Sequence, residues 1–190
     1  VISEGRVIIT PRDSEELHCL GLEDGRQLWS QPRGDGSFVA AVHAGRVVVV
    51  GRSQVMAFRL ADGEPAWSAP VRIPRPSGVG VRSGSRYHLP VVIGTGQPER
   101  GAILTLDLVS GRLLARTEID SGRPLGNLVN GGGRLLALSP DELVGFHPDE
   151  ALREEISRRL GQDADDPGAL AIRGRQRLHR GEFDGGLNDL

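Results

Sequence analysis

The 190-residue sequence is poor in cysteine, in aromatic residues and in long apolar runs. Its single cysteine, Cys19, cannot form an internal disulfide, and its apolar surroundings in the sequence predict that it is buried. Aromatic residues make up 4% of the chain, so valine, leucine and isoleucine must build the core. Because no apolar run reaches about 18 residues, the sequence offers no candidate for a membrane-spanning helix.

The sequence also lacks an excess of charge of either sign. It has 23 basic and 25 acidic residues and a net charge of −2. This balance gives no electrostatic reason to expect binding to nucleic acid or to an anionic membrane surface. The sequence opens at Val1, within a strand pattern and without an initiator methionine, so we expect a piece of a longer protein. The absence of a signal peptide is then uninformative.

One pattern recurs along the first 149 residues. It combines an alternating apolar strand, a polar pair, a glycine and a second strand, and it occurs as Glu16–Trp29, Gln54–Trp67 and Ala102–Ala115. The turn glycines Gly25, Gly63 and Gly111 are 38 and 48 residues apart. A half-copy, Glu142–His147, begins the same strand and then meets Pro148. Periods near 40 residues that contain strands favour the blades of a β-propeller.

Each repeat contains two further strands before this pattern. A tight Gly-Arg turn leads into an apolar strand at Gly5-Arg6, Gly45-Arg46 and Gly133-Arg134. A leading strand precedes the turn at Val1-Ile2, at Phe38–Val42 and at about Leu125–Val129. We therefore predict a mostly β fold with about four blades of four antiparallel strands, the last without its outer strand.

Both faces of these predicted sheets are apolar. Equivalent positions hold the small residues Cys19, Ala57, Thr105 and Gly145, and the next positions hold the large residues Leu20, Phe58, Leu106 and Phe146. Adjacent strand residues point to opposite faces, so each sheet must be covered on both sides by its neighbours. Trp29 and Trp67, at the ends of the predicted outer strands, are expected to pack between blades.

The apolar period changes to about 3.6 after Phe146. Asp149 can cap a helix with Leu152, Ile156 and Leu160 on one face and Gly161 as its stop. Asp166-Pro167 is typical of the start of another helix, which is expected to end near Gly181 and to be followed by a further helix. We predict two parts, residues 1–149 and 150–190.

The repeat resembles the pyrroloquinoline-quinone (PQQ)-type propeller repeat, whose consensus is close to Ala-x-Asp-x-x-Thr-Gly-x-x-x-Trp. Ala57–Trp67 and Cys19–Trp29 carry this resemblance, and Asp107 keeps the aspartate of the family. Ala115 replaces the tryptophan, so the resemblance implies a degenerate, structural version of the repeat. The last predicted blade lacks its outer strand, which in a closed propeller usually comes from the start of the chain. We therefore expect residues 1–149 to be the C-terminal part of a ring of six to eight blades; the alternative is a free-standing arc with two open blade edges.

The tail, Pro167–Leu190, resembles the first two-thirds of a tetratricopeptide repeat. Arg173-Gly174 and Gly181-Glu182-Phe183 are the most specific elements of this resemblance. A generic helical hairpin is the alternative.

The candidate binding segment is Val71–Leu89, which absorbs most of the extra length of the third repeat. Loops on a rigid scaffold often carry binding residues, and the residues in question are Arg72, Arg75, Arg82, Arg86, Tyr87 and His88. The alternative is a solvated connection without a partner. A second long turn, Thr95–Arg100, is a possible neighbour on the same rim.

No pattern of catalytic or metal-binding residues stands out. Gly78-Val79-Gly80 and Gly94-Thr95-Gly96 lack the further glycine and the helix of a nucleotide site. The histidines are dispersed and Cys19 has no paired cysteine, so we expect no metal site. The acidic break Gln162–Asp166 is expected to be a helix linker; Asp163, Asp165 and Gly168 resemble a calcium loop only faintly, because Pro167 replaces a ligand.

Three functional hypotheses remain. The first is a non-catalytic scaffold that binds protein partners, with no cofactor and no nucleic acid. The second is a fragment of a PQQ-dependent dehydrogenase, a class that the resemblance associates with calcium-binding carboxylates and a vicinal cysteine pair; a single cysteine argues against it. The third is a ligand-sensing propeller of a larger signalling or transport protein. The resemblance implies a periplasmic or extracytoplasmic location.

Overall fold

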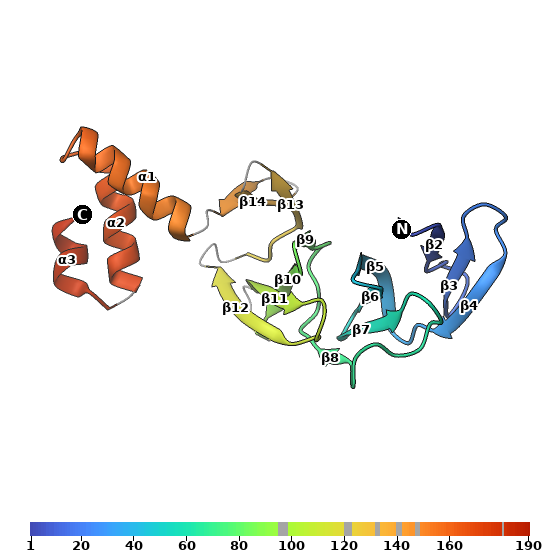
Figure 1. The fold of residues 1–190 in the computed structure, drawn as a ribbon. Coiled ribbons are helices and arrows are strands. Elements are labelled where there is room, and N and C mark those ends of the chain that lie inside the picture. The colour runs from blue at the N-terminus through green and yellow to red at the C-terminus, as the bar shows by residue number, and fades with distance from the viewer. Residues whose placement is uncertain (95–98, 120–122, 132–133, 140–141, 147–148, 180) are drawn as a thin grey trace. The chain divides into compact units, whose positions relative to one another are not determined.

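The computed structural model describes residues 1–94, 99–119, 123–131, 134–139, 142–146, 149–179 and 181–190, without the side chains of 149–151 and 179. The chain divides into two compact units, Val1–Gly145 and Phe146–Leu190, which are the strands and the helices of Figure 1. The predictions that concern the turn at Thr95–Arg100, Gly133, Pro148 and the Asp149 cap rest wholly or partly on residues or side chains outside these described parts.

The first unit consists of four antiparallel sheets in which neighbours in sequence are neighbours in space. The first sheet contains β1 (Ile2–Ser3), β2 (Arg6–Ile9), β3 (Glu16–Gly21) and β4 (Gln27–Pro32). The second contains β5 (Gly36–His43), β6 (Arg46–Gly51), β7 (Gln54–Arg59) and β8 (Val71–Arg72). The third contains β9 (Val81–Ser83), β10 (Arg86–Ile93), β11 (Arg100–Asp107) and β12 (Leu113–Ile119). The fourth has three strands, β13 (Asn127–Gly131), β14 (Arg134–Leu138) and β15 (Leu143–Phe146).

This arrangement confirms the predicted series of blade-like sheets, and the described part of the last sheet has three strands. The Gly-Arg turns form because Glu4 and Gly5 both have positive φ values, 49° and 69°, as do Ala44 and Gly45, 46° and 68°. Two successive positive φ values are the signature of a type I′ turn, whose twist matches that of the strands it joins.

The second sheet is buried on both faces, as its sequence predicts. Along β6, alternate valines take part in different apolar clusters. Val47 and Val49 cluster with the first-sheet residues Ile8, Leu17, Cys19 and Trp29. Val48 and Val50 cluster with the third-sheet residues Tyr87, Leu89, Leu104 and Leu106. Each buried valine contributes roughly 1.5–3 kcal/mol, so neighbouring sheets stabilise one another.

Tryptophan side chains join successive sheets, which confirms their predicted role. The Trp29 ring lies against Gly63 of the second sheet, where an added Cβ would come within 2.7 Å of Trp29 Cε3. Trp29 Nε1 also donates a hydrogen bond of 3.0 Å to the carbonyl of Leu60. Trp67 lies in the same way against Gly111 of the third sheet, where an added Cβ would be 2.6 Å from its Cδ2.

Two predictions about the second and third sheets were wrong. Trp67 lies outside a regular strand, because Pro65 and Pro70 interrupt the outer edge and leave the two-residue β8. The segment Val71–Leu89 is not one long loop, since it contains β8, β9 and the start of β10. Its prolines and glycines suggested a loop, but Pro76 pairs with Val91 and Ser77 N donates to the carbonyl of Pro90 at 3.0 Å.

The second unit contains three helices, α1 (Asp149–Gln162), α2 (Pro167–His179) and α3 (Phe183–Asn188). Asp166 caps α2 as predicted, because its Oδ1 accepts a hydrogen bond from Ala169 N at 2.9 Å. Gly161 lies inside α1 rather than stopping it. No helix in the described residues has the length and apolarity needed to cross a membrane.

Close backbone contact and ion pairing hold α2 against the C-terminal segment. A Cβ on Gly174 would lie 2.9 Å from the carbonyl of Gly186, so neither helix tolerates a larger residue there. The carboxylate of Asp189, whose side chain is 5% exposed, accepts hydrogen bonds from Arg173 at 2.6 and 2.8 Å and from Arg177 at 2.8 Å. The Arg173 hydrogen bonds, with the charges of both arginines, hold the pKa of Asp189 below its usual value despite desolvation.

The tryptophan contact predicts different costs for two turn glycines. Gly63 and Gly25 both have positive φ values, 80° and 67°, but nothing lies within 4 Å of a Cβ on Gly25. Both Gly→Ala variants should lower the free energy of unfolding by about 1–2 kcal/mol, because alanine is strained in the left-handed conformation. Gly63→Ala should lose about 1–3 kcal/mol more, because its Cβ displaces the Trp29 ring. Urea unfolding measures both variants, and equal losses would contradict the proposed contact.

The Asp189 cluster predicts acid sensitivity of the helical unit. Since the folded pKa of Asp189 is lowered, the stabilisation is complete above the unfolded pKa of about 3.9 and is lost as the pH falls below it. Asp189→Asn should unfold more easily at neutral pH and lose part of this acid dependence. Ellipticity at 222 nm during acid titration measures the effect, with the exposed Asp184→Asn as the control that should titrate like the parent.

Candidate functional site

Each sheet of the first unit has two distinct ends. The connector end holds two connections: the loop from the second to the third strand of a sheet, and the segment that leads from one sheet to the next. At the turn end lie the tight turns, including those of Gly5, Gly45 and Gly84. On the second sheet, whose two faces are occupied by packing, the strand ends are the parts most open to a ligand.

The structure separates the arginines that the sequence placed in one binding segment. Arg75 lies at the connector end, where its carbonyl accepts a hydrogen bond from Val92 N at 2.9 Å. Arg86 begins β10 at the turn end, where it pairs with Ser83 of β9, and the neighbouring Arg82 pairs with Tyr87. Because eight strand residues span about 23 Å, these side chains do not form one site. Arg72, in β8 opposite Gln54, is nearer to Arg75.

Tyr87 and His88 are held within the third sheet. Tyr87 is 1% exposed, and burial raises the pKa of its hydroxyl. His88 Nδ1 is 3.1 Å from Thr105 Oγ1, and desolvation, with a smaller effect from the charge of Arg86, lowers the pKa of His88. Tyr87 therefore belongs to the core and offers no contact to a partner.

Among the described residues, three of the clefts at the connector end each lie at the boundary of two successive sheets. The first cleft, of about 360 Å³, lies between the first and second sheets and is lined by Thr10, Arg12, Arg33, Gly34, Asp35, Gly36, Ser37 and Arg52. The second, of about 410 Å³, is lined by Ser37, Phe38, Gly51, Arg52, Arg75, Pro76, Ser77 and Gly78. The third, of about 320 Å³, is lined by Arg75, Ser77, Val92, Glu99, Arg123, Pro124, Leu125, Gly126, Ser139 and Glu142.

A short motif that the sequence reasoning missed supplies an arginine to each cleft. Arg-x-x-Gly occurs where the chain enters each new sheet, as Arg33–Gly36, Arg75–Gly78 and Arg123–Gly126. The motif glycines are required by close packing: a Cβ on Gly36 would be 2.7 Å from the Arg33 carbonyl, and one on Gly78 would be 2.6 Å from the Gly126 carbonyl. Its recurrence in three successive repeats is the signal that could have revealed it.

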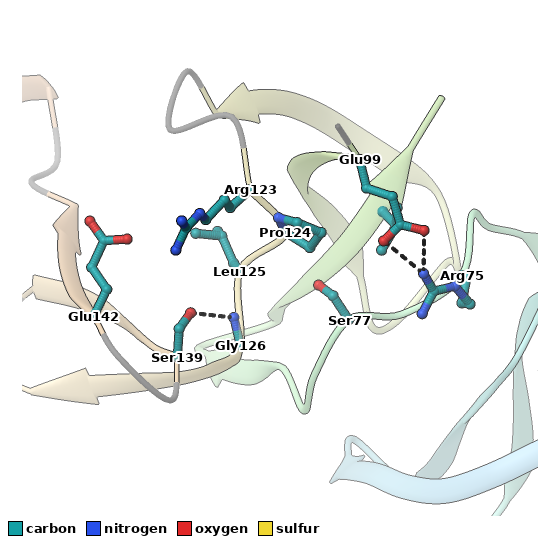
Figure 2. Close-up of a pocket in the computed structure, with 10 residues that line it drawn as sticks. Arg75, Ser77, Glu99, Arg123, Pro124, Leu125, Gly126, Ser139 and Glu142 are labelled. Atoms are coloured by element: carbon teal, nitrogen blue, oxygen red, sulfur yellow. Dashed lines mark hydrogen bonds and ion pairs between the residues drawn. The ribbon is translucent and has the colours of Figure 1, made fainter. Parts of the chain in front are cut away.

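The third cleft has balanced charges. Figure 2 shows Arg75 paired with Glu99 on one side and Ser139 bonded to the Gly126 amide on the other, with Arg123 and Glu142 also lining the cleft. Arg75 Nη2 is 2.9 and 3.1 Å from the two Glu99 oxygens. Gly126 N donates to Ser139 Oγ at 3.2 Å. Two arginines thus face two carboxylates in this cleft.

The first and second clefts have a different charge balance. Asp35 is the acidic residue of their lining, and its Oδ2 accepts hydrogen bonds of 2.7 Å from both the amide and the hydroxyl of Ser53. Desolvation opposes ionisation of Asp35, but the Ser53 bonds, with smaller effects from Gln54 and from the charge of Arg52, hold its pKa below the usual value. Asp35 therefore stays ionised, and its carboxylate is bonded to Ser53. Among the described residues, the guanidinium groups of Arg12, Arg33 and Arg52 make no hydrogen bond or ion pair.

One further polar cluster lies on the first sheet. Ser14 Oγ is 3.1 Å from His18 Nε2, and His18 Nδ1 is 3.1 Å from Gln27 Oε1. The Ser14 hydroxyl also accepts a hydrogen bond from Glu16 N at 3.1 Å, which is the geometry of a local turn. Among the described residues, no group of three or more His, Cys, Asp or Glu side chains is arranged to hold a metal ion.

The Arg75–Glu99 pair predicts that Arg75 can be replaced without loss of the fold. The two side chains are 62% and 40% exposed, and exposed ion pairs contribute about 0–1 kcal/mol. Arg75→Ala should therefore change the free energy of unfolding by less than about 1 kcal/mol, measured by urea denaturation. A loss above about 2 kcal/mol would show that Arg75 supports the structure rather than a surface.

Comparison with solved structures places the fold among propellers. BamB from Moraxella catarrhalis matches at a TM-score of 0.57 and 18% identity, over 75% of this chain and 42% of that chain. The Pan2 WD40 domain of Neurospora crassa matches at 0.54 and 13%, over 77% and 44%. A quinohemoprotein alcohol dehydrogenase of Pseudomonas putida HK5 matches at 0.47 and 13%, over 76% and 34%. The chain thus spans less than half the length of each of these structures.

No curated protein matches the chain. A family profile described as outer membrane protein assembly factor BamB matches residues 1–142, about three quarters of the sequence. This range contains the three full copies of the repeated pattern and the residues that line the connector-end clefts. Since this match covers well over half of the chain, the chain belongs to the BamB-type family of PQQ-like propeller repeat proteins.

Proposed function

We propose that this chain is a non-catalytic binding module that contacts a protein partner through the connector end of its sheets. The observation that carries the proposal is the row of three clefts, each of about 320–410 Å³, at consecutive sheet boundaries of one end. Their linings are loops fixed at both ends by buried strands. Rigid loops with arginine side chains are favourable for protein contacts, because little conformational entropy is lost on binding.

The proposal includes the absence of a catalytic cofactor. Tryptophan rings, which could otherwise stack on a planar cofactor, are seated between sheets against Gly63 and Gly111. Cys19 is buried, and burial raises the pKa of its thiol. A buried thiol without a neighbouring cysteine in the sequence is unsuited to the vicinal cysteine pair of PQQ-dependent dehydrogenases. We also propose an extracytoplasmic location, in keeping with the outer-membrane description of the family.

We extend the proposal to the helical unit, as the beginning of a tetratricopeptide-like array that adds a second protein-binding surface. Its sequence resemblance supports this view, as does the close approach of Gly174 and Gly186, which allows α2 and α3 to pack tightly. Phe183, Leu187 and Leu190 are about two-thirds exposed in the unit as described, an apolar stripe that a following helix of such an array would cover.

Site-specific photo-crosslinking tests which end of the sheets meets the partner. All 23 basic residues are arginines and the chain has no lysine, so amine-reactive reagents have almost no target. A photoreactive phenylalanine analogue at position 75 should yield a discrete adduct in cells, identified by mass spectrometry. The same analogue at exposed position 86, at the turn end, is the matched control and should yield none. Equal adducts, or none from position 75, would refute the proposal.

Titration with PQQ and calcium tests the dehydrogenase alternative. If the module is non-catalytic, the cofactor absorbance should remain that of free PQQ at every protein concentration. Saturable spectral change with a fixed stoichiometry would contradict the proposal and favour a dehydrogenase fragment. Calcium alone and PQQ alone are the controls for non-specific effects.

A further inference from the structure

The first and second clefts form one continuous site, because Ser37 and Arg52 line both of them. Arg12 and Arg33 lie on one side of this site and Arg75 on the other. Four arginines therefore border two adjoining clefts, although the chain as a whole has a net charge of −2. A local positive region on an acidic chain requires a specific explanation, since it does not follow from composition.

The arginines of this double cleft have unused hydrogen-bonding capacity. The guanidinium groups of Arg12, Arg33 and Arg52 make neither hydrogen bonds nor ion pairs within the described residues. Each guanidinium offers five N–H donors in a planar fork that fits a carboxylate. Asp35, the acidic residue of the lining, already accepts two hydrogen bonds of 2.7 Å from Ser53. Arg75 is paired with Glu99, in an exposed pair that a ligand can replace at little cost.

The rest of the lining suits a polypeptide. Phe38 and Pro76 give the second cleft an apolar wall beside Arg52 and Arg75. Ser77 Oγ, in the lining of the second cleft, is buried with no hydrogen-bond partner among the described residues. Its hydroxyl can therefore donate a hydrogen bond to a ligand. A cleft of about 410 Å³ accommodates one or two side chains. Arginines beside apolar walls favour a ligand that alternates carboxylates with apolar groups.

We propose that the first and second clefts bind an acidic, extended segment of a partner polypeptide, with Arg52 at the centre of the site. This inference rests on the proposed function and specifies the chemistry of the partner. Successive carboxylates of the segment meet Arg12 and Arg33, then Arg52, then Arg75, while an apolar side chain between them lies on Phe38. Nucleic acid is a poorer fit, because it needs many phosphate contacts and the overall charge of the chain opposes them.

Fluorescence anisotropy with a short labelled peptide that alternates glutamate and leucine tests the proposal on the full chain. The parent should bind it, and a peptide with glutamine in place of glutamate should not bind. Arg52→Gln should weaken binding about tenfold or more, a loss of about 1.4 kcal/mol. The matched control is Arg86→Gln, which removes an equally exposed arginine at the turn end and should leave the affinity within about twofold. Raising the salt concentration should weaken binding by the parent more than by Arg52→Gln.

Several outcomes would overturn the inference. These are no binding of the glutamate peptide, equal effects of Arg52→Gln and Arg86→Gln, or stronger competition by single-stranded DNA or inorganic phosphate than by unlabelled peptide. Circular dichroism verifies that both variants are folded. If the peptide does not bind but position 75 still crosslinks to a protein, the proposed function stands and the acidic chemistry of the partner is wrong. If neither result is obtained, both proposals fail.

Discussion

A tryptophan ring seated on a glycine of the next sheet is the contact on which the first unit depends. Trp29 requires the bare backbone of Gly63, and Trp67 requires that of Gly111, because any Cβ would enter the ring. The third repeat has Ala115 at the same position, and the sheet that follows has no outer strand and no corresponding turn in the described residues. Among the described sheets, this contact therefore joins the first sheet to the second and the second to the third.

Burial of both sheet faces determines where function can lie. On β6, Val47 and Val49 pack toward the first sheet, while Val48 and Val50 pack toward the third. Side chains on these faces are committed to the core, as Tyr87 illustrates. On this second sheet, polar groups able to contact a ligand lie mainly at the strand ends. At the connector end the two chain crossings of each sheet adjoin, and this is where the clefts and the Arg-x-x-Gly motif occur.

Local features of the sequence predicted much of the fold, but contacts distant in sequence decided the site. The tight turns, the two-faced sheets and the Asp166 cap follow from short patterns, and the structure confirms them. Val71–Leu89 was wrongly predicted as one loop, because its prolines hide a strand pairing that only Val91 reveals. The separation of Arg75 from Arg86 follows from the length of β10. The motif glycines were missed because close contacts such as that between Gly78 and Gly126 join segments that are distant in sequence.

The joint between Trp29 and Gly63 also bears on how such a chain can change during evolution. The ring belongs to one repeat and its seat to the next. Duplication or recombination that copies a single repeat at its strand boundaries therefore copies a tryptophan without the glycine turn that it contacts, or the glycine turn without its tryptophan. The transferable module is shifted by half a repeat and runs from one ring to the next.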